Sequence, residues 1–186
     1  MLKRDAPIHI LLTGNRNIGK STIVKQLLNM MSIQPLGFMT VPYFDESNRL
    51  KGFALQSFDI ALPKTISTKN AIGYTDGSTW IACPEVFDNF GVSLLRTALK
   101  RAQSLIVMDE LGFFESTALV FQKQVLQCLD QTKIPVLAVV KNAQTDFLDE
   151  IKSHLNTELF HVSLENRNQL PEILTNKLQE VRRLQL

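Results

Sequence analysis

The sequence predicts an α/β fold in which helices cover both faces of a mostly parallel β-sheet. Apolar runs of strand length, rich in β-branched residues, alternate with segments of helical period along the chain. Strands that are buried on both faces read as such continuous apolar runs, and a parallel sheet buries both of its faces. The chain has 186 residues, which suits one domain, so we expect residues 1–186 to form a single unit.

Each expected element follows from its own local pattern. Residues 8–13 form an apolar strand, and residues 20–31 have the 3.6-residue period of a helix. Two strand-like runs on either side of a polar turn predict a β-hairpin near residues 36–58. The segment 59–82 lacks periodicity, so we expect mainly loops there, with room for one more strand. The remaining expected elements are helices at 84–103, 116–131, 145–155 and 170–184, and strands at 105–108, 134–140 and 159–164.

Composition argues against several classes of protein. The chain has 20 basic and 18 acidic residues and no long run of like charge, so we expect no nucleic-acid partner. Cys83 and Cys128 form no CxxC pair, which argues against a structural zinc site and favours a reducing compartment. The apolar run at residues 8–12 is too short for a signal peptide or a membrane span. We therefore expect a cytoplasmic protein with no membrane partner.

A phosphate-binding loop follows the first expected strand. The segment Gly14-Asn-Arg-Asn-Ile-Gly-Lys-Ser21 fits the Walker A motif G-x-x-x-x-G-K-[ST] at full spacing. Such a loop wraps a phosphate with its backbone N–H groups and then begins a helix whose N-terminus faces the same anion. We expect Lys20 to act in catalysis at the β- and γ-phosphates, and Ser21 to ligate Mg²⁺. The nucleotide-binding residues would be Gly14, Asn15, Arg16, Asn17, Ile18, Gly19, Lys20, Ser21 and Thr22.

An acidic pair ends the apolar strand expected at residues 105–108. Ligands of parallel sheets sit outside the carboxyl ends of the strands, so Asp109 would face the Mg²⁺ held by Ser21. Glu110, the next residue, would then activate the water that attacks the γ-phosphorus. The alternative is an acidic pair that only caps the strand end. The phosphate loop upstream favours the metal and water roles.

These motifs and several others together resemble the small P-loop nucleoside-triphosphatases of the cancer-related nucleoside triphosphatase type. The resemblance rests on Gly37-Phe-Met-Thr40, Lys51-Gly-Phe53, Glu115 after the acidic pair, and Glu165-Asn-Arg-Asn168, and it spans nearly the whole chain. It implies a three-layer, RecA-like P-loop fold. It also implies a Mg²⁺-dependent enzyme that slowly hydrolyses several NTPs, ATP and GTP among them, to NDP and phosphate.

The chain departs from the pattern of that family at several positions. Arg16 and Asn17 stand where the family has Pro-Gly, although asparagine tolerates the left-handed conformation that the loop needs. Gly-Phe-Phe-Glu at residues 112–115 replaces the family's Gly-Pro-Met-Glu. The family's Gly-Lys-Tyr segment is not visible around residues 82–88. We therefore expect a divergent member whose substrate or partner can differ.

Three further groups of residues allow two interpretations each. Asn166 and Arg167 follow an expected strand, where they would contact the nucleotide or merely form a helix-capping turn. Lys141 and Asn142 end another strand, where they would sense the γ-phosphate or belong to a surface loop. The pair Phe113-Phe114 would pack on a base or a partner, or fill the core.

Two other functions are compatible with the same phosphate loop. A nucleoside or nucleotide kinase would transfer the phosphoryl group to an acceptor, although no Arg-rich lid segment is visible. A nucleotide-dependent binding module would act on an unknown protein partner, and slow hydrolysis of the nucleotide would return it to its starting state. A small GTPase is disfavoured because the base-reading motif Asn-Lys-x-Asp is absent from the sequence.

Overall fold

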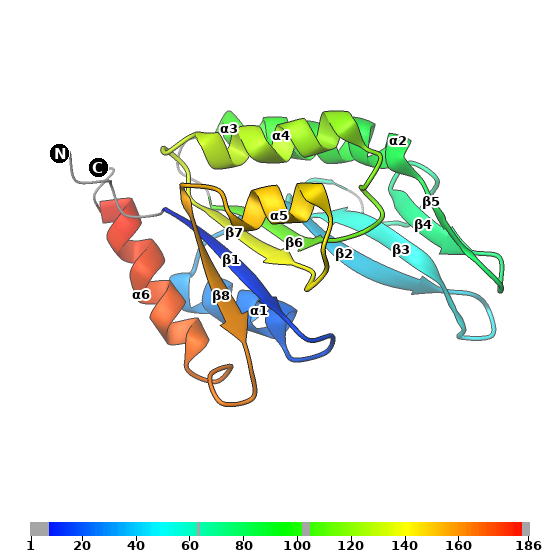
Figure 1. Cartoon of the computed structure of the whole chain (residues 1–186). Helices are drawn as coiled ribbons and strands as arrows, with labels where there is room; N and C mark the ends of the chain where they lie inside the picture. Colours follow the sequence, from blue (N-terminus) through cyan, green and yellow to red (C-terminus); the bar gives the residue numbers. More distant parts are fainter. Residues whose placement is uncertain (1–7, 63, 102–104, 184–186) are drawn as a thin grey trace.

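The computed structural model describes residues 8–62, 64–101 and 105–183. Its strands form one eight-stranded sheet in the order β5-β4-β3-β2-β6-β7-β1-β8 (Figure 1). The neighbouring pairs among β2, β6, β7, β1 and β8 are parallel. The strands β3, β4 and β5 extend the sheet beyond β2 through antiparallel pairs. The strands are β1 (His9–Gly14), β2 (Leu36–Phe44), β3 (Leu50–Ser57), β4 (Ala71–Thr75), β5 (Trp80–Ala82), β6 (Ile106–Leu111), β7 (Val136–Val140) and β8 (Thr157–Val162).

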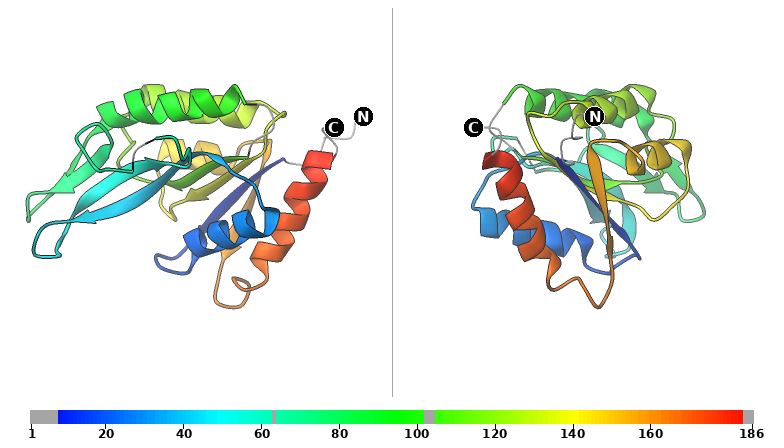
Figure 2. Two further views of the ribbon diagram at one scale, coloured as in Figure 1. Left: turned by 180° about the vertical axis from the view of Figure 1, so that it is seen from behind. Right: turned by 60° about the vertical axis from the view of Figure 1, so that its left-hand side comes forward.

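Helices cover both faces of the sheet, which confirms the predicted fold class. The helices α1 and α6 lie side by side on one face, and α3, α4 and α5 cover the other (Figures 1 and 2). None of the helices in the described part of the chain is long and apolar enough to cross a membrane. The helices are α1 (Lys20–Met31), α2 (Pro84–Val86), the π-helical turn η1 (Phe87–Gly91), α3 (Val92–Leu99), α4 (Leu119–Asp130), α5 (Asp146–Lys152) and α6 (Leu170–Arg183).

The alternation of side chains along β1 divides the core into two layers. Ile10 and Leu12 point to one face, where they belong to the same buried cluster as Ile23 of α1 and Leu174 of α6. Leu11 points to the other face, into the cluster that α3, α4 and α5 build. Because both faces of this strand are buried, its sequence is continuously apolar instead of alternating.

Two segments differ from the sequence prediction. The segment 59–82 contains two short strands, β4 and β5, which the weak periodicity did not reveal because five- and three-residue strands give too few repeats. The single helix expected at 84–103 is divided into α2, η1 and α3 and ends at Leu99. Its last predicted residues, 102–104, lie outside the described part of the chain.

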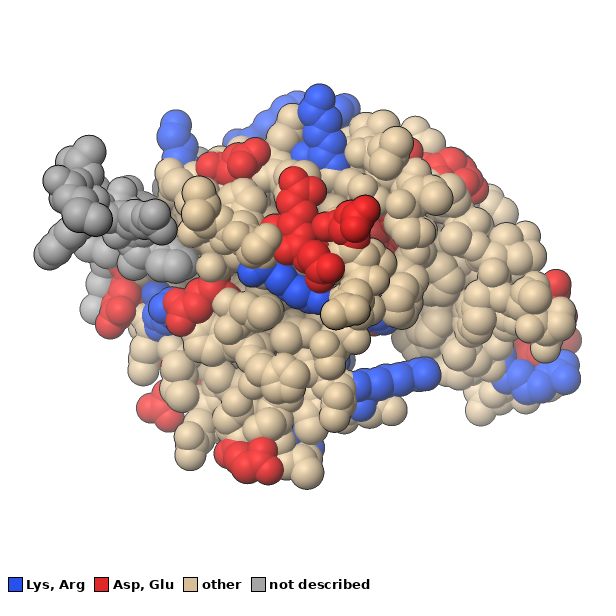
Figure 3. Space-filling view, in the orientation of Figure 1, with Lys and Arg blue, Asp and Glu red and all other residues tan. Residues whose placement is uncertain are grey.

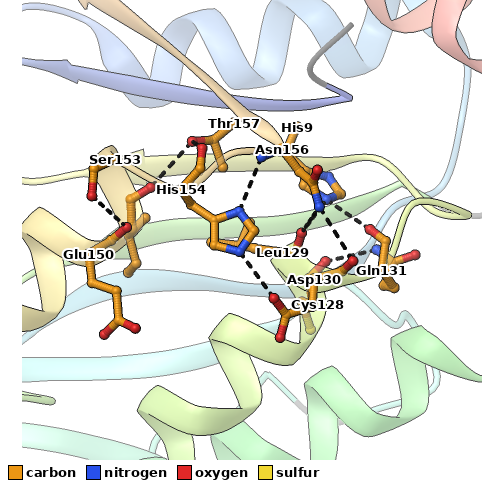
Figure 4. Close-up of polar contacts among 11 residues, drawn as sticks. His9, Cys128, Leu129, Asp130, Gln131, Glu150, Ser153, His154, Asn156 and Thr157 are labelled. Carbon is orange, nitrogen blue, oxygen red and sulfur yellow. Dashed lines mark hydrogen bonds and ion pairs between the residues drawn. The ribbon is translucent and has the colours of Figure 1, made fainter. Parts of the chain in front are cut away.

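A buried histidine fastens the amino-terminal end of the sheet to the end of α4 (Figure 4). His9 donates through Nε2 to the carbonyl oxygens of Leu129 and Gln131, at 3.1 and 3.0 Å, and its Nδ1 accepts from the Val136 N–H at 3.0 Å. These contacts require a neutral ring with the proton on Nε2. Burial lowers the pKa of His9 to about 4, which favours the same neutral form.

Candidate functional site

A cleft lies at the carboxyl ends of the strands β1, β6 and β7. Its volume is about 1030 Å³, at the upper limit of common ligand pockets. Figure 3 shows it as a hollow between the body of the protein and the part that contains β2–β5. The cleft is lined by Gly14, Asn15, Arg16, Asn17, Gly19, Lys20, Ser21, Thr22, Thr40, Pro42, Leu50, Phe53, Ile72, Trp80, Asp109, Glu110, Gly112, Phe113, Phe114, Glu115, Lys141 and Asn142.

The phosphate loop connects the end of β1 to the start of α1. Gly14 has φ = 142°, and a Cβ atom there would lie 2.6 Å from the Val162 carbonyl oxygen of β8, so only glycine fits. Gly19 caps α1 with φ = 112°. Asn17 has φ = 62°, so asparagine adopts the left-handed conformation that this position requires.

Lys20 folds back into this loop. Its Nζ donates to the carbonyl oxygens of Gly14 and Asn15, at 3.0 and 2.9 Å. Burial lowers the pKa of Lys20, while the nearby carboxylates of Glu110 and Asp109 act in the opposite direction. The ammonium group is thus held by backbone carbonyls in the space that the loop encloses.

Asp109 meets the phosphate loop across the cleft floor. Ser21 Oγ donates to Asp109 Oδ1 at 3.1 Å, which joins residues 88 positions apart. Asp109 is buried, and this burial raises its pKa to about 6, although the bond from Ser21 opposes the rise. A buried carboxylate and a hydroxyl are hard oxygen donors of the kind that Mg²⁺ takes from proteins alongside substrate phosphates. The donor set therefore fits a magnesium ion.

Glu110 lies beside Lys141, which comes from the end of β7. Lys141 Nζ is 3.2 Å from Glu110 Oε1, and it lies over the rings of Phe113 and Phe114 at 5.2 and 5.9 Å from their centroids. A Cβ atom on Gly112 would approach Lys141 Cδ to 2.7 Å, so the glycine leaves room for the lysine to cross the strand end. The backbone N–H of Glu110 also lies 3.4 Å from Thr40 Oγ1 on β2.

Glu115 is a third carboxyl group in the lining of the cleft. It is almost completely buried, and its Oε1 accepts a hydrogen bond from the Gly112 N–H. Burial raises the pKa of Glu115 to about 7, and the bond from Gly112 and the charge of Lys141 counteract this rise only in part. Glu115 therefore fixes the turn after β6 that carries Gly112.

Comparisons with known proteins agree with this geometry. A family model described as NTPase matches residues 9–175, which is most of the chain. The chain belongs to the NTPase family. It is 29% identical to the nucleoside-triphosphatase THEP1 of Thermotoga petrophila over 161 residues, which cover 87% of each chain. It is 25% identical to the cancer-related nucleoside-triphosphatase homolog of Bos taurus over 181 residues, which cover 90% of this chain and 95% of the relative.

Solved structures share the fold of this NTPase. The crystal structure of THEP1 from the hyperthermophile Aquifex aeolicus superposes with a TM-score of 0.73 at 21% identity, over 92% of this chain and 99% of that one. The solution structure of a human cancer-related nucleoside triphosphatase gives a TM-score of 0.72 at 21% identity, over 92% and 97% of the two chains. The solved structures confirm the predicted P-loop α/β fold. The family model and the curated relatives confirm the predicted family and the NTP-hydrolysing activity.

Most of the predicted site residues come together in the NTPase cleft. The exceptions are Ile18, which packs against the core beneath the loop, and Asn166 and Arg167, which lie after β8 outside the cleft lining. Asn166 Oδ1 accepts from the Ser163 N–H at 2.9 Å, and its Nδ2 donates to the His161 carbonyl at 2.8 Å. Asn166 therefore forms a turn in this structure, and a nucleotide contact for it stays a prediction.

The sequence also left some cleft residues unassigned. Thr40 belongs to the segment Gly37-Phe-Met-Thr40 that supported the resemblance, but it had no proposed role. Phe53, Ile72 and Trp80 reach the cleft from β3, β4 and β5. The last two strands fall in the segment of weak periodicity, so no pattern in the sequence predicts that Trp80 lines the same cleft as the acidic pair.

Proposed function

We propose that this NTPase holds Mg-NTP in the cleft and cleaves the γ-phosphate with a water molecule that Glu110 activates. The observation that carries the proposal is the contact between Ser21 and Asp109, 3.1 Å long. It joins the phosphate loop to the end of β6, and Glu110 is the next residue along that strand. The phosphates and the carboxylate would therefore meet at one point of the cleft.

The phosphate loop would bind the triphosphate. The backbone N–H groups at the start of α1 face an anion favourably, and the left-handed residues shape the loop around it. Lys20 would exchange the carbonyls of Gly14 and Asn15 for β- and γ-phosphate oxygens. Arg16 is exposed in the same loop and would add a second cation near the phosphates.

Ser21 and Asp109 would hold the magnesium ion. When bound, Mg²⁺ neutralises phosphate charge and orients the oxygens of the triphosphate. Asp109 is buried in the free protein with a raised pKa, so a cation beside it would favour its ionised form. The Ser21 hydroxyl would then release Asp109 and turn its oxygen to the metal.

Glu110 would accept a proton from the attacking water. In the free cleft its side chain is paired with Lys141, which holds it at the end of β6. A γ-phosphate between Lys20 and Lys141 would draw the Lys141 ammonium away and leave the carboxylate free to bind water. The same ammonium would offset the negative charge on the γ-phosphate oxygens during the transfer.

The replacement Glu110→Gln tests this assignment, because it keeps the shape of the side chain. We expect nucleotide affinity to stay within about threefold and single-turnover cleavage at saturating Mg-NTP to slow by roughly 10²–10⁴-fold. Glu158→Gln is the matched control, since Glu158 on β8 also pairs with a lysine but lies outside the cleft lining. A Glu110→Gln rate within about threefold of wild type would reject the role, with a barrier change under about 0.7 kcal/mol.

Two broader expectations accompany the proposal. We propose that residues 1–186 act as one catalytic domain, which is supported by the single sheet that carries both the phosphate loop and the acidic pair. We also propose a reducing compartment, the cytoplasm, which is supported by the free thiols of Cys83 and Cys128.

A further inference from the structure

The cleft extends past the place that the NTP would fill. The phosphate loop follows β1, and Glu110 lies at the end of β6, two strands away with β7 between them. Strands are about 4.8 Å apart, so β1 and β6 are separated by about 10 Å, a distance that Ser21 bridges by its contact with Asp109. If the γ-phosphate faces Glu110, the α-phosphate and the base extend the opposite way, toward β8. The cleft continues beyond Glu110 over β2–β5, where that base does not reach.

Aromatic side chains line this far end of the cleft. The ring centroids of Phe53, Trp80 and Phe114 lie 5.5–5.9 Å apart, the spacing of packed aromatic pairs. Although packed together, they are not closed off: Trp80 is 48% exposed, and the neighbouring Phe113 is 54% exposed. These four residues form what we call the aromatic end.

The other side chains at the far end determine what kind of molecule fits there. Those that β2–β5 contribute to the cleft lining are Thr40, Pro42, Leu50, Phe53, Ile72 and Trp80. None of these described residues is charged, so this wall would not bind a phosphate group, which proteins usually hold with arginine or lysine. A flat, neutral molecule would gain apolar contact and stacking instead.

The aromatic end also adjoins the catalytic carboxylate that we propose. The Phe114 ring is 5.8 Å from Trp80 on one side and 5.9 Å from Lys141 Nζ on the other. Lys141 in turn lies 3.2 Å from Glu110. One lysine side chain therefore separates the aromatic rings from Glu110, and a polar group on a stacked molecule would point toward that carboxylate.

We propose that the aromatic end is a second binding site, for a neutral, flat molecule that carries a hydroxyl group, with nucleosides as the ligand class. The proposal rests on the function proposed above, because it gives Glu110 a second proton donor besides water. The acceptor's hydroxyl oxygen attacks the γ-phosphorus, and its proton passes to Glu110. The bond between the γ-phosphorus and the bridging oxygen breaks, which yields NDP and the phosphorylated acceptor.

Water takes the place of the acceptor when the aromatic end is empty. The chain is then an NTPase that also transfers phosphate, and hydrolysis is its reaction in the absence of the second substrate. Its acceptor is a neutral nucleoside and not a nucleoside monophosphate, because the residues that β2–β5 contribute to the cleft include no cation for a second phosphate, and the nearby Lys141 is already paired with Glu110.

Binding can be measured without catalysis, because Trp80 is the single tryptophan of the chain. We expect adenosine to quench the tryptophan fluorescence saturably, and to do so equally in wild type and in Lys20→Ala. Lys20→Ala impairs the phosphate loop, so unchanged quenching in this variant separates the adenosine site from the NTP site. Absence of saturable quenching by adenosine, guanosine and thymidine would overturn the proposal and leave the exposed rings to a macromolecular partner.

Transfer is measured with γ-³²P-labelled Mg-ATP and adenosine, as the ratio of labelled nucleoside to labelled free phosphate. We expect Trp80→Ala to lower this ratio at least tenfold, and Trp80→Phe, which keeps a ring, to restore most of it. Phe44→Ala is the matched control, since Phe44 is 52% exposed at the end of β2 but does not line the cleft.

The two measurements fail in different ways. Quenching without any labelled nucleoside would refute the acceptor chemistry. If wild type does not hydrolyse ATP, the proposed function is refuted, while saturable quenching in the same protein would still support the second binding site. A ratio that falls equally in Trp80→Ala and Phe44→Ala would refute a specific role for the aromatic end.

Discussion

Lys141 gives the sharpest prediction, because it should distinguish a triphosphate from a diphosphate. Its ammonium is paired with Glu110 in the free cleft and lies on the same side of the phosphate loop as the expected γ-phosphate. A diphosphate bound at the loop lacks the group that would draw Lys141 away from Glu110. Lys141→Met should therefore weaken NTP binding and leave NDP binding within about twofold.

The expected size follows from two opposing contributions. A hydrogen bond to a charged group is worth about 1.5–3 kcal/mol. NTP must first displace Lys141 from Glu110, and an ion pair of this kind contributes about 0.2–1 kcal/mol, here near the upper value because both side chains are about one third exposed. The difference leaves about 0.5–2 kcal/mol, which corresponds to a loss of NTP affinity of about two- to thirtyfold.

Calorimetric titration with a non-hydrolysable NTP analogue and with NDP, both in Mg²⁺, measures this difference. Lys177→Met is the matched control: Lys177 also pairs with a glutamate, Glu158, and lies 6.0 Å from the centroid of Phe160, but outside the cleft lining. Lys141→Arg keeps the charge and should retain most of the discrimination. Equal losses for NTP and NDP in Lys141→Met, or a similar loss in Lys177→Met, would refute the reasoning.

Three further predictions test the loop, the metal and the buried histidine. Lys20→Ala should weaken NTP binding at least tenfold, about 1.4 kcal/mol, in a titration with a fluorescent NTP; unchanged affinity contradicts the phosphate-loop assignment. Asp109→Asn should raise the Mg²⁺ concentration for half-maximal activity, and an unchanged metal titration argues against that ligand. The pKa of His9 falls from 6.5 to about 4 on folding, so its stabilising contribution is complete above pH 6.5 and is lost as the pH falls toward 4. Urea unfolding at pH 7 and pH 5 should show about 2 kcal/mol of this loss in wild type relative to His9→Gln; the comparison cancels Glu115, whose raised pKa acts in the opposite direction.

The sequence predicted the central part of the fold well. The longer strands and helices, such as α1, β2, β6, α4 and β7, have enough residues for their apolar period to show, and each contributes to a buried cluster. For residues 59–82 we expected loops with room for one strand, whereas the structure has two, β4 and β5. β5 is exposed along its whole length and carries no burial pattern. The break in the helix after Pro84 was missed as well, since a π-helical turn leaves the composition of a helix unchanged.

The candidate site shows the same contrast between local and distant information. The Walker A spacing and the acidic pair are local signals, and β-strand alternation explains why Asp109 shares a face with Val107, the face that α1 covers. The pairing of Glu110 with Lys141 depends on β6 and β7 being neighbours, which the sequence does not state. Trp80 is a further case, because it reaches the cleft only through the antiparallel extension of the sheet.

Three charged groups of the free cleft have partners that a nucleotide would replace. Lys20 is held by backbone carbonyls, Asp109 by Ser21, and Glu110 by Lys141. Binding is therefore an exchange of contacts, and only the γ-phosphate would reach the last of the three pairs. A diphosphate would occupy the loop and still leave Glu110 paired. The proton acceptor would thus become free only when a cleavable phosphate is present, which links activation of water to the presence of substrate without any movement of the backbone.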